Sequence, residues 1–135
     1  MIVADTSVAV AGFARWHEWH AAARVALREG ARLVAHSALE TYSVLTRLPP
    51  PNRVSGVAVR DYLERSFSDS YLTLRPRDQR LLVPRLVELE VAGGAVYDAL
   101  IALTAASAGA SLLTCDRRAR ETYQRCGVDA HLLGR

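Results

Sequence analysis

Short apolar segments alternate with longer segments of helical periodicity along this chain, and that alternation restricts the folds it can adopt. The apolar segments that predict strands are residues 2–4, 33–35, 71–74, 111–114 and 130–132. The helical segments begin at Ser7 and then cover residues 15–30, 37–48, 55–67, 77–94, 97–109 and 117–127. Strands that alternate with helices favour a parallel sheet covered by helices on both faces. The length of 135 residues predicts one α/β domain over residues 1–135.

The N-terminal segment is apolar but does not have the pattern of a secretory leader. It lacks a basic region, and Asp5 interrupts its apolar run. The longest uncharged run that follows an acid, residues 99–115, has 17 residues and is broken by "SAGAS". A membrane span needs about 20 apolar residues. We therefore expect a cytoplasmic protein without a membrane segment.

Four acidic residues stand alone in otherwise uncharged stretches. Asp5 is the only charged residue in residues 1–14, and Glu40 is the only formal charge in residues 33–46. Asp98 is the only charge in residues 91–115, and Asp116 follows the uncharged segment "ASLLTC". Asp5 and Asp116 each follow a predicted strand, so a parallel sheet would bring both to the edge where its ligands bind.

Each acid also has a purely structural interpretation. Asp5 and Asp116 could cap the helices that follow them. Ser37 and Glu40 have the spacing of a capping box, and Asp98 would be a favourable charge in the first turn of a helix. Taken singly, these interpretations are as good as a functional one.

Taken together, the four acids favour a shared anionic site. Carboxylates in apolar surroundings are costly unless they are paired or bind a metal ion. Carboxylates that lie close together repel one another and raise one another's pKa, so the site favours a divalent cation. Oxygen ligands without a cluster of cysteine or histidine favour Mg²⁺, or else Mn²⁺, over zinc.

At these residues the sequence resembles the PIN-domain nucleases, and among them the VapC-like toxins of bacterial toxin–antitoxin pairs. The matching segments are "IVADTSV", "HSALETYSVLTRL" and "GGAVYDALIALTAASAGASLLTCDRRA". The third segment is the most specific, because it joins a helix led by Asp98 to a strand that ends just before Asp116. The resemblance extends over essentially the whole chain.

The resemblance implies a fold, an activity and partners. It implies a three-layer α/β/α sandwich with a short, mainly parallel sheet. The acids matching the family's metal site are Asp5, Glu40, Asp98 and Asp116, and Ser7 and Thr114 match supporting polar positions. It further implies Mg²⁺-dependent endoribonuclease activity, a small cognate antitoxin and a homodimer. Tyr97 departs from the polar or basic residue that related sequences often carry before the aspartate.

Arginine is the only strongly basic residue type in the chain, which has 17 arginines and no lysine. Outside the four acids, 17 arginines stand against 10 other acids, so the remaining surface is basic. This balance suits a protein that handles phosphate backbones. Arg117 and Arg118 adjoin Asp116 and are the candidates for substrate binding, although any one cluster of arginines could be an ordinary solvated surface.

Other classes of protein are less consistent with the sequence. Dehalogenase-type phosphatases and response-regulator receivers also place an aspartate at a strand end, but both rely on a lysine. The segment "HEWH" at residues 17–20 has the wrong spacing for a zinc-protease motif and predicts part of an amphipathic helix. Two alternatives stay open: a non-catalytic PIN-fold module that binds RNA or protein, and a nuclease that acts on DNA.

Overall fold

The computed structural model describes residues 1–134, which contain one parallel sheet. Its strands are β1 (Ile2–Ala4), β2 (Arg32–Leu33), β3 (Ser111–Thr114) and β4 (Ala130–Leu132), in the order β2-β1-β3-β4. Each neighbouring pair is parallel, with Val3 aligned with Arg32 on one side and with Leu112 on the other. Because all the strands run in one direction, their carboxyl ends share one edge of the sheet.

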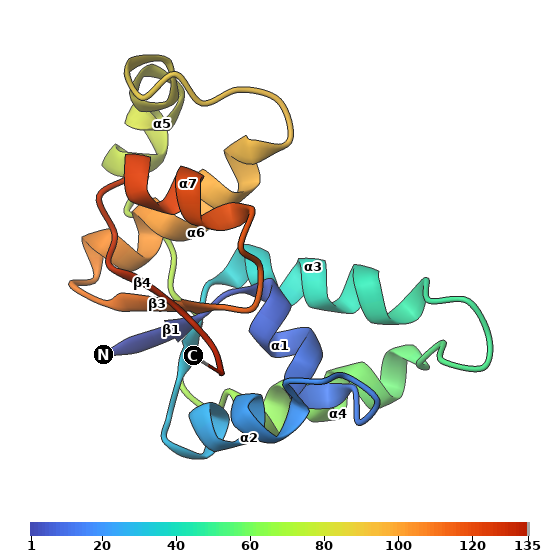
Figure 1. Cartoon of the computed structure of the whole chain (residues 1–135). Helices are drawn as coiled ribbons and strands as arrows, with labels where there is room; N and C mark the ends of the chain where they lie inside the picture. Colours follow the sequence, from blue (N-terminus) through green and yellow to red (C-terminus); the bar gives the residue numbers. More distant parts are fainter. Residues whose placement is uncertain (135) are drawn as a thin grey trace.

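Helices cover both faces of this sheet, as the sequence predicts. They are α1 (Thr6–Phe13), α2 (His20–Arg28), α3 (Ala35–Thr46), α4 (Gly56–Ser66), α5 (Pro76–Glu88), α6 (Ala95–Ser107) and α7 (Ala119–Arg125). Figure 1 shows α5, α6 and α7 on one side of the strands and α1 to α4 on the other. The expected three-layer α/β/α sandwich is therefore confirmed.

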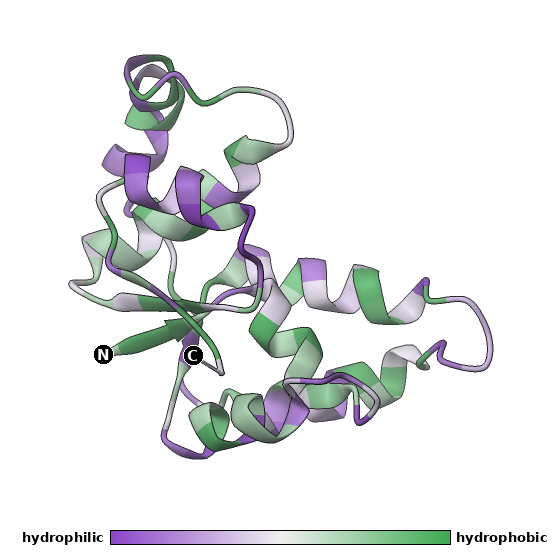
Figure 2. Ribbon diagram, in the orientation of Figure 1, coloured by the Kyte–Doolittle hydropathy of each residue, from purple (hydrophilic) through white to green (hydrophobic). Residues whose placement is uncertain are grey.

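Two apolar clusters, one on each side of the sheet, form the core. Val3 packs with Ile101 of α6 and Tyr123 of α7, whereas the next residue, Ala4, packs with Val8 of α1 and other residues of the α1–α4 layer. This alternation follows from the two-residue period of a strand. Figure 2 shows mainly apolar colours on β1 and hydrophilic colours along the outward side of α7.

Some predicted boundaries were wrong. The second strand covers only Arg32–Leu33, because α3 already begins at Ala35. The strand expected at residues 71–74 is a single bridge, in which Leu72 pairs with Val34. The helix expected over residues 15–30 begins only at His20, and residues 15–19 form turns. One reason is that the Nδ1 of His17 accepts a hydrogen bond from the backbone N–H of Trp19 at 3.0 Å, which organises a turn.

The structure also bears on membrane insertion and on the state of the two cysteines. Among residues 1–134, no helix combines the length and the apolar character that crossing a bilayer requires. Cys115 and Cys126 are both free thiols.

Candidate active site

Two of the four isolated acids lie where neighbouring strands end. Asp5 directly follows β1, and its backbone N–H donates to the carbonyl of Leu113 at 3.0 Å, which extends the pairing with β3. Asp116 follows β3 after one intervening residue. The prediction that these two acids share the carboxyl edge of the sheet is confirmed.

Asp5 is held almost entirely inside the protein. It is 3% exposed. Its Oδ1 accepts hydrogen bonds from the Ser7 hydroxyl at 2.5 Å and from the Val8 N–H at 3.1 Å, and its Oδ2 accepts one from the Tyr123 hydroxyl at 2.7 Å. The bond to Val8 caps α1, so the capping role of Asp5 is also confirmed. Burial raises the pKa of this carboxyl, although its hydrogen bonds act in the opposite direction.

Ser7 and Thr114 connect the two strand ends. The Ser7 hydroxyl, which donates to Asp5, accepts the N–H of Cys115 at 2.8 Å and lies 3.3 Å from the Thr114 hydroxyl. The Thr114 hydroxyl accepts the N–H of Asp116 at 2.9 Å. The two hydroxyls thus join the Asp5 carboxylate to the backbone that carries Asp116.

Glu40 reaches the same region from the second turn of α3. Its Oε1 accepts a hydrogen bond of 2.6 Å from the hydroxyl of Thr6, at the start of α1. The capping-box interpretation of Ser37 and Glu40 is wrong, because Val34 is the N-cap of α3 and Ser37 already lies inside the helix. The Glu40 carboxylate is therefore oriented by a different helix and not by its own N-terminus.

Asp98 enters from the opposite layer, in the first turn of α6. Burial is the largest cause, and together with the charges of Asp5, Glu40 and Asp116 it raises the pKa of this carboxyl to about 6. The four acids therefore interact electrostatically. All four line one pocket of about 350 Å³, together with residues of α1 and the turn at His17.

The pocket is an open cluster of oxygen donors. Within residues 1–134, no three histidine, cysteine, aspartate or glutamate side chains are gathered closely enough to enclose a metal ion by themselves. A cation with few direct protein contacts suits such an arrangement. Mg²⁺ commonly binds in this way, because it retains several water ligands and is often held by only one or two carboxylates.

Three aromatic or imidazole side chains near the acids were not predicted as site residues. Tyr123 donates to Asp5, and His17 lines the pocket. The Nε2 of His36 lies 3.8 Å from Glu40 Oε2, and its ring stacks on that of Tyr97 with centroids 5.3 Å apart. Of these three residues, only His17 belongs to a motif noted in the sequence, "HEWH", but that segment was interpreted as part of a helix.

The two candidate substrate-binding arginines occupy the rim. Arg117 and Arg118 are exposed, and the backbone N–H of Arg118 donates to Asp116 Oδ1 at 2.9 Å. Neither side chain lines the acidic pocket. Their contact with substrate stays a prediction.

A short parallel sheet between two helical layers, with four acids in a pocket at its carboxyl edge, is the arrangement expected of a PIN domain. The PIN domain model matches residues 2–124, and the chain belongs to this family. It is 56% identical over 133 residues to Ribonuclease VapC40 of Mycobacterium tuberculosis, covering 98% of this chain and 99% of that protein. It is 45% identical over 129 residues to Ribonuclease VapC27 of the same species, covering 94% and 93%. The family resemblance seen in the sequence is confirmed.

The raised pKa of Asp98 predicts how stability depends on pH without metal. Asp98 binds its proton more tightly in the folded protein, at a pKa of about 6 against 3.8, so protonation stabilises the fold. This contribution is complete below the unfolded value and is lost as the pH rises through about 6. In EDTA, we expect the melting temperature to rise by a few degrees more between pH 7.5 and 5 than it does for Asp98→Asn. Identical pH profiles for the two proteins would contradict the electrostatic coupling of these acids.

Proposed function

We propose that this protein is a Mg²⁺-dependent endoribonuclease and the toxin of a toxin–antitoxin pair. The observation that carries the proposal is the convergence of four carboxylates, from two strand ends and two helices, on one pocket in which Asp5 is buried and Asp98 is half-buried. The VapC ribonucleases to which the chain is similar support RNA as the substrate. An acidic pocket of this kind repels a phosphodiester unless cations screen it.

The donor set fits a hard divalent cation. Asp5, Asp98 and Asp116 offer carboxylate oxygens to Mg²⁺ or Mn²⁺, and Glu40 either binds the metal or orients the attacking water. Burial and then repulsion by the neighbouring acids raise the pKa of Asp98, and a bound cation would relieve that repulsion. When bound, Mg²⁺ lowers the pKa of water and stabilises the charge that develops on the phosphate.

The residues of the chain supply the positioning for hydrolysis. Because Thr6 occupies Glu40 Oε1, the other oxygen is the one available to accept a hydrogen bond from the attacking water. That water would attack phosphorus in line with the oxygen that leaves, so that one P–O bond forms as the other breaks. Ser7 supports the site by donating to the Asp5 carboxylate, and Thr114 supports it by accepting the backbone N–H of Asp116. Arg117 and Arg118 on the rim would contact neighbouring phosphates.

The same proposal includes the partners of the protein. We infer a small cognate antitoxin, a homodimer and action in the cytoplasm, where RNA and the antitoxin are made. These points rest on the resemblance to VapC-like toxins. Size-exclusion chromatography with light scattering measures the oligomeric state directly.

Cleavage of labelled nucleic acids tests the activity. The purified protein, free of antitoxin, is incubated with labelled total RNA and with single-stranded DNA, in Mg²⁺, Mn²⁺ or EDTA. We expect discrete fragments from RNA in Mg²⁺ and none in EDTA, because the acidic pocket cannot approach phosphate without a cation. Sequencing the fragment ends identifies the RNA and the bond that is cut.

The other outcomes correspond to the two alternatives left open by the sequence. Cleavage of DNA with no cleavage of RNA would reassign the substrate. Binding of RNA with no cleavage in either metal would indicate a non-catalytic module. Either result would overturn the proposed function.

A further inference from the structure

A second hollow lies beside the acidic pocket and has the opposite charge. It occupies about 590 Å³ between α1, α2, α4 and the loop that precedes α4, and it adjoins a hollow of about 350 Å³ with which it shares Arg24, Tyr62 and Arg65. We call the combined feature the arginine furrow. Its basic side chains are Arg15, Arg24, Arg28 and Arg65. Within residues 1–134, no carboxylate lines either hollow.

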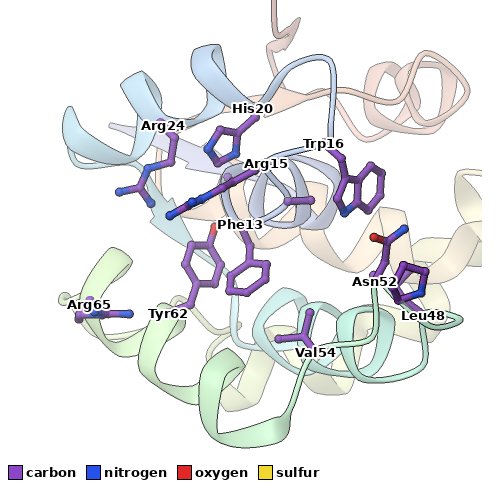
Figure 3. Close-up of a pocket in the computed structure, with 13 residues that line it drawn as sticks. Phe13, Arg15, Trp16, His20, Arg24, Leu48, Asn52, Val54, Tyr62 and Arg65 are labelled. Atoms are coloured by element: carbon purple, nitrogen blue, oxygen red, sulfur yellow. The ribbon is translucent and has the colours of Figure 1, made fainter.

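The arginines of the furrow are available to a ligand. In the described part of the chain, none of the four forms a salt bridge, whereas Arg32, just beyond them, pairs with Asp69 at 3.8 Å. Arg15, Arg28 and Arg65 are exposed and Arg24 is half-buried. Figure 3 shows Arg15 and Arg24 extending over the same side of the hollow as Tyr62.

The floor of the furrow is rigid. Tyr62 donates a hydrogen bond of 2.6 Å to the carbonyl of Ala9, and its ring meets Phe13 edge-on at 5.2 Å. Gly12 permits this close approach, because a Cβ there would lie 2.6 Å from both the Tyr62 hydroxyl and the Leu27 side chain. A packed floor fixes the helices that carry the arginines before a ligand binds, which reduces the entropic cost of binding.

An exposed aromatic ring stands at the other end of the first hollow. Trp16 lines that hollow and is 58% exposed, and Figure 3 places its ring on the side of Asn52 and Leu48, away from Arg24. Guanidinium groups bind phosphate oxygens in pairs, and an exposed indole stacks on a base. Together these groups match single-stranded nucleic acid better than they match an apolar helix.

The turn that follows α1 supplies residues to both the furrow and the acidic pocket. Val10 and His17 line the acidic pocket, and Phe13, Arg15 and Trp16 line the furrow. A strand bound at the acids could therefore continue past His17 into the furrow. We infer that the arginine furrow binds the RNA backbone on one side of the scissile phosphate, with a base stacked on Trp16; this rests on the proposed ribonuclease function.

Binding in an inactive background tests the inference without relying on cleavage. The protein carries Asp98→Asn, the buffer contains EDTA, and the probe is a fluorescein-labelled single-stranded RNA of about 12 nucleotides, long enough to span the two hollows. Affinity is measured by anisotropy at several KCl concentrations. For Arg24→Gln with Arg65→Gln we expect about tenfold weaker binding, and a salt slope reduced by about 1.4, because two phosphate contacts are lost.

Two further variants separate charge from stacking. Arg77→Gln with Arg80→Gln removes two exposed arginines from α5, on the other side of the sheet, and should leave both the affinity and the salt slope within twofold of the parent. Trp16→Ala should weaken binding about tenfold with an unchanged salt slope, since stacking releases no counterions. In the active protein, the furrow variant should raise KM for long RNA and leave kcat unchanged.

Clear results would overturn the inference. One is RNA binding by the furrow variant that equals the parent at every salt concentration. Another is a furrow variant that loses affinity for a polyglutamate peptide but not for RNA, which would assign the furrow to an acidic protein. Failure of the ribonuclease proposal gives a different pattern, in which the parent cuts no RNA while the furrow variant still loses RNA binding.

Discussion

Replacing Asp98 with asparagine should abolish cleavage while leaving the fold intact. The amide keeps the shape of the side chain but loses the charge that holds a cation. Loss of several kcal/mol of transition-state stabilisation corresponds to a decrease of about 1,000-fold or more in kcat. The fold should persist because burial and the neighbouring acids already disfavour the ionised form of Asp98. Single-turnover cleavage of the identified RNA measures the rate, and circular dichroism checks the fold.

Asp78→Asn is the matched control for this substitution. Asp78 lies in the first turn of α5, as Asp98 lies in the first turn of α6, and it does not line the acidic pocket. The two changes therefore remove the same charge from equivalent helical positions. We expect Asp78→Asn to cleave RNA at the parent rate. A normal rate for Asp98→Asn would remove Asp98 from the proposed site.

Truncation of Leu112 should destabilise the fold strongly. Leu112 is 0% exposed at the centre of β3, where its backbone pairs with Val3 on one side and Ala130 on the other. Leu112→Ala removes buried methyl groups and leaves a cavity, at a cost of about 2–5 kcal/mol. Since small domains are stable by only about 5–15 kcal/mol, the melting temperature should fall by about 10 °C or more.

Leu39→Ala is the control for this truncation. Leu39 lies in α3 and is 69% exposed, so the same change of side chain should alter stability by less than about 0.5 kcal/mol. Chemical denaturation of both variants gives the two free energies of unfolding. Equal losses in the two variants would contradict the packing described for β3.

The sequence predicts the layers of this fold and the acids of its site for related reasons. The strands and helices are recognisable from apolar periodicity, and Asp5 and Asp98 are recognisable because they are isolated charges in apolar stretches. Burial acts on both features, which is why both leave a pattern in the sequence. The prediction of a strand at residues 71–74 was wrong because Leu72 makes only a single bridge, to Val34. The position of that bridge depends on where α3 begins, which the local sequence does not indicate.

The parts of the site that were not predicted depend on tertiary packing. Tyr123 reaches Asp5 only because α7 lies across the sheet, since the two residues are 118 positions apart in the sequence. His17 faces the acids because residues 15–19 form turns where a helix was expected. The furrow arginines lie from Arg15 to Arg65 and form no cluster in the sequence. Arg117 and Arg118 were predicted because they adjoin Asp116 in the sequence, whereas none of the furrow arginines adjoins one of the four acids.

The different burial of the four acids has an evolutionary consequence. Asp5 is buried and caps α1, whereas Glu40 and Asp98 are half-buried and Asp116 is exposed. A single base change that removes one of the latter three carboxylates should therefore silence the enzyme without unfolding it. A gene copy altered in this way would still encode a folded protein that competes with the active form for the same partners. In a lineage that carries several copies of such a gene, one substitution is enough to convert an active nuclease into an inactive competitor of the other copies.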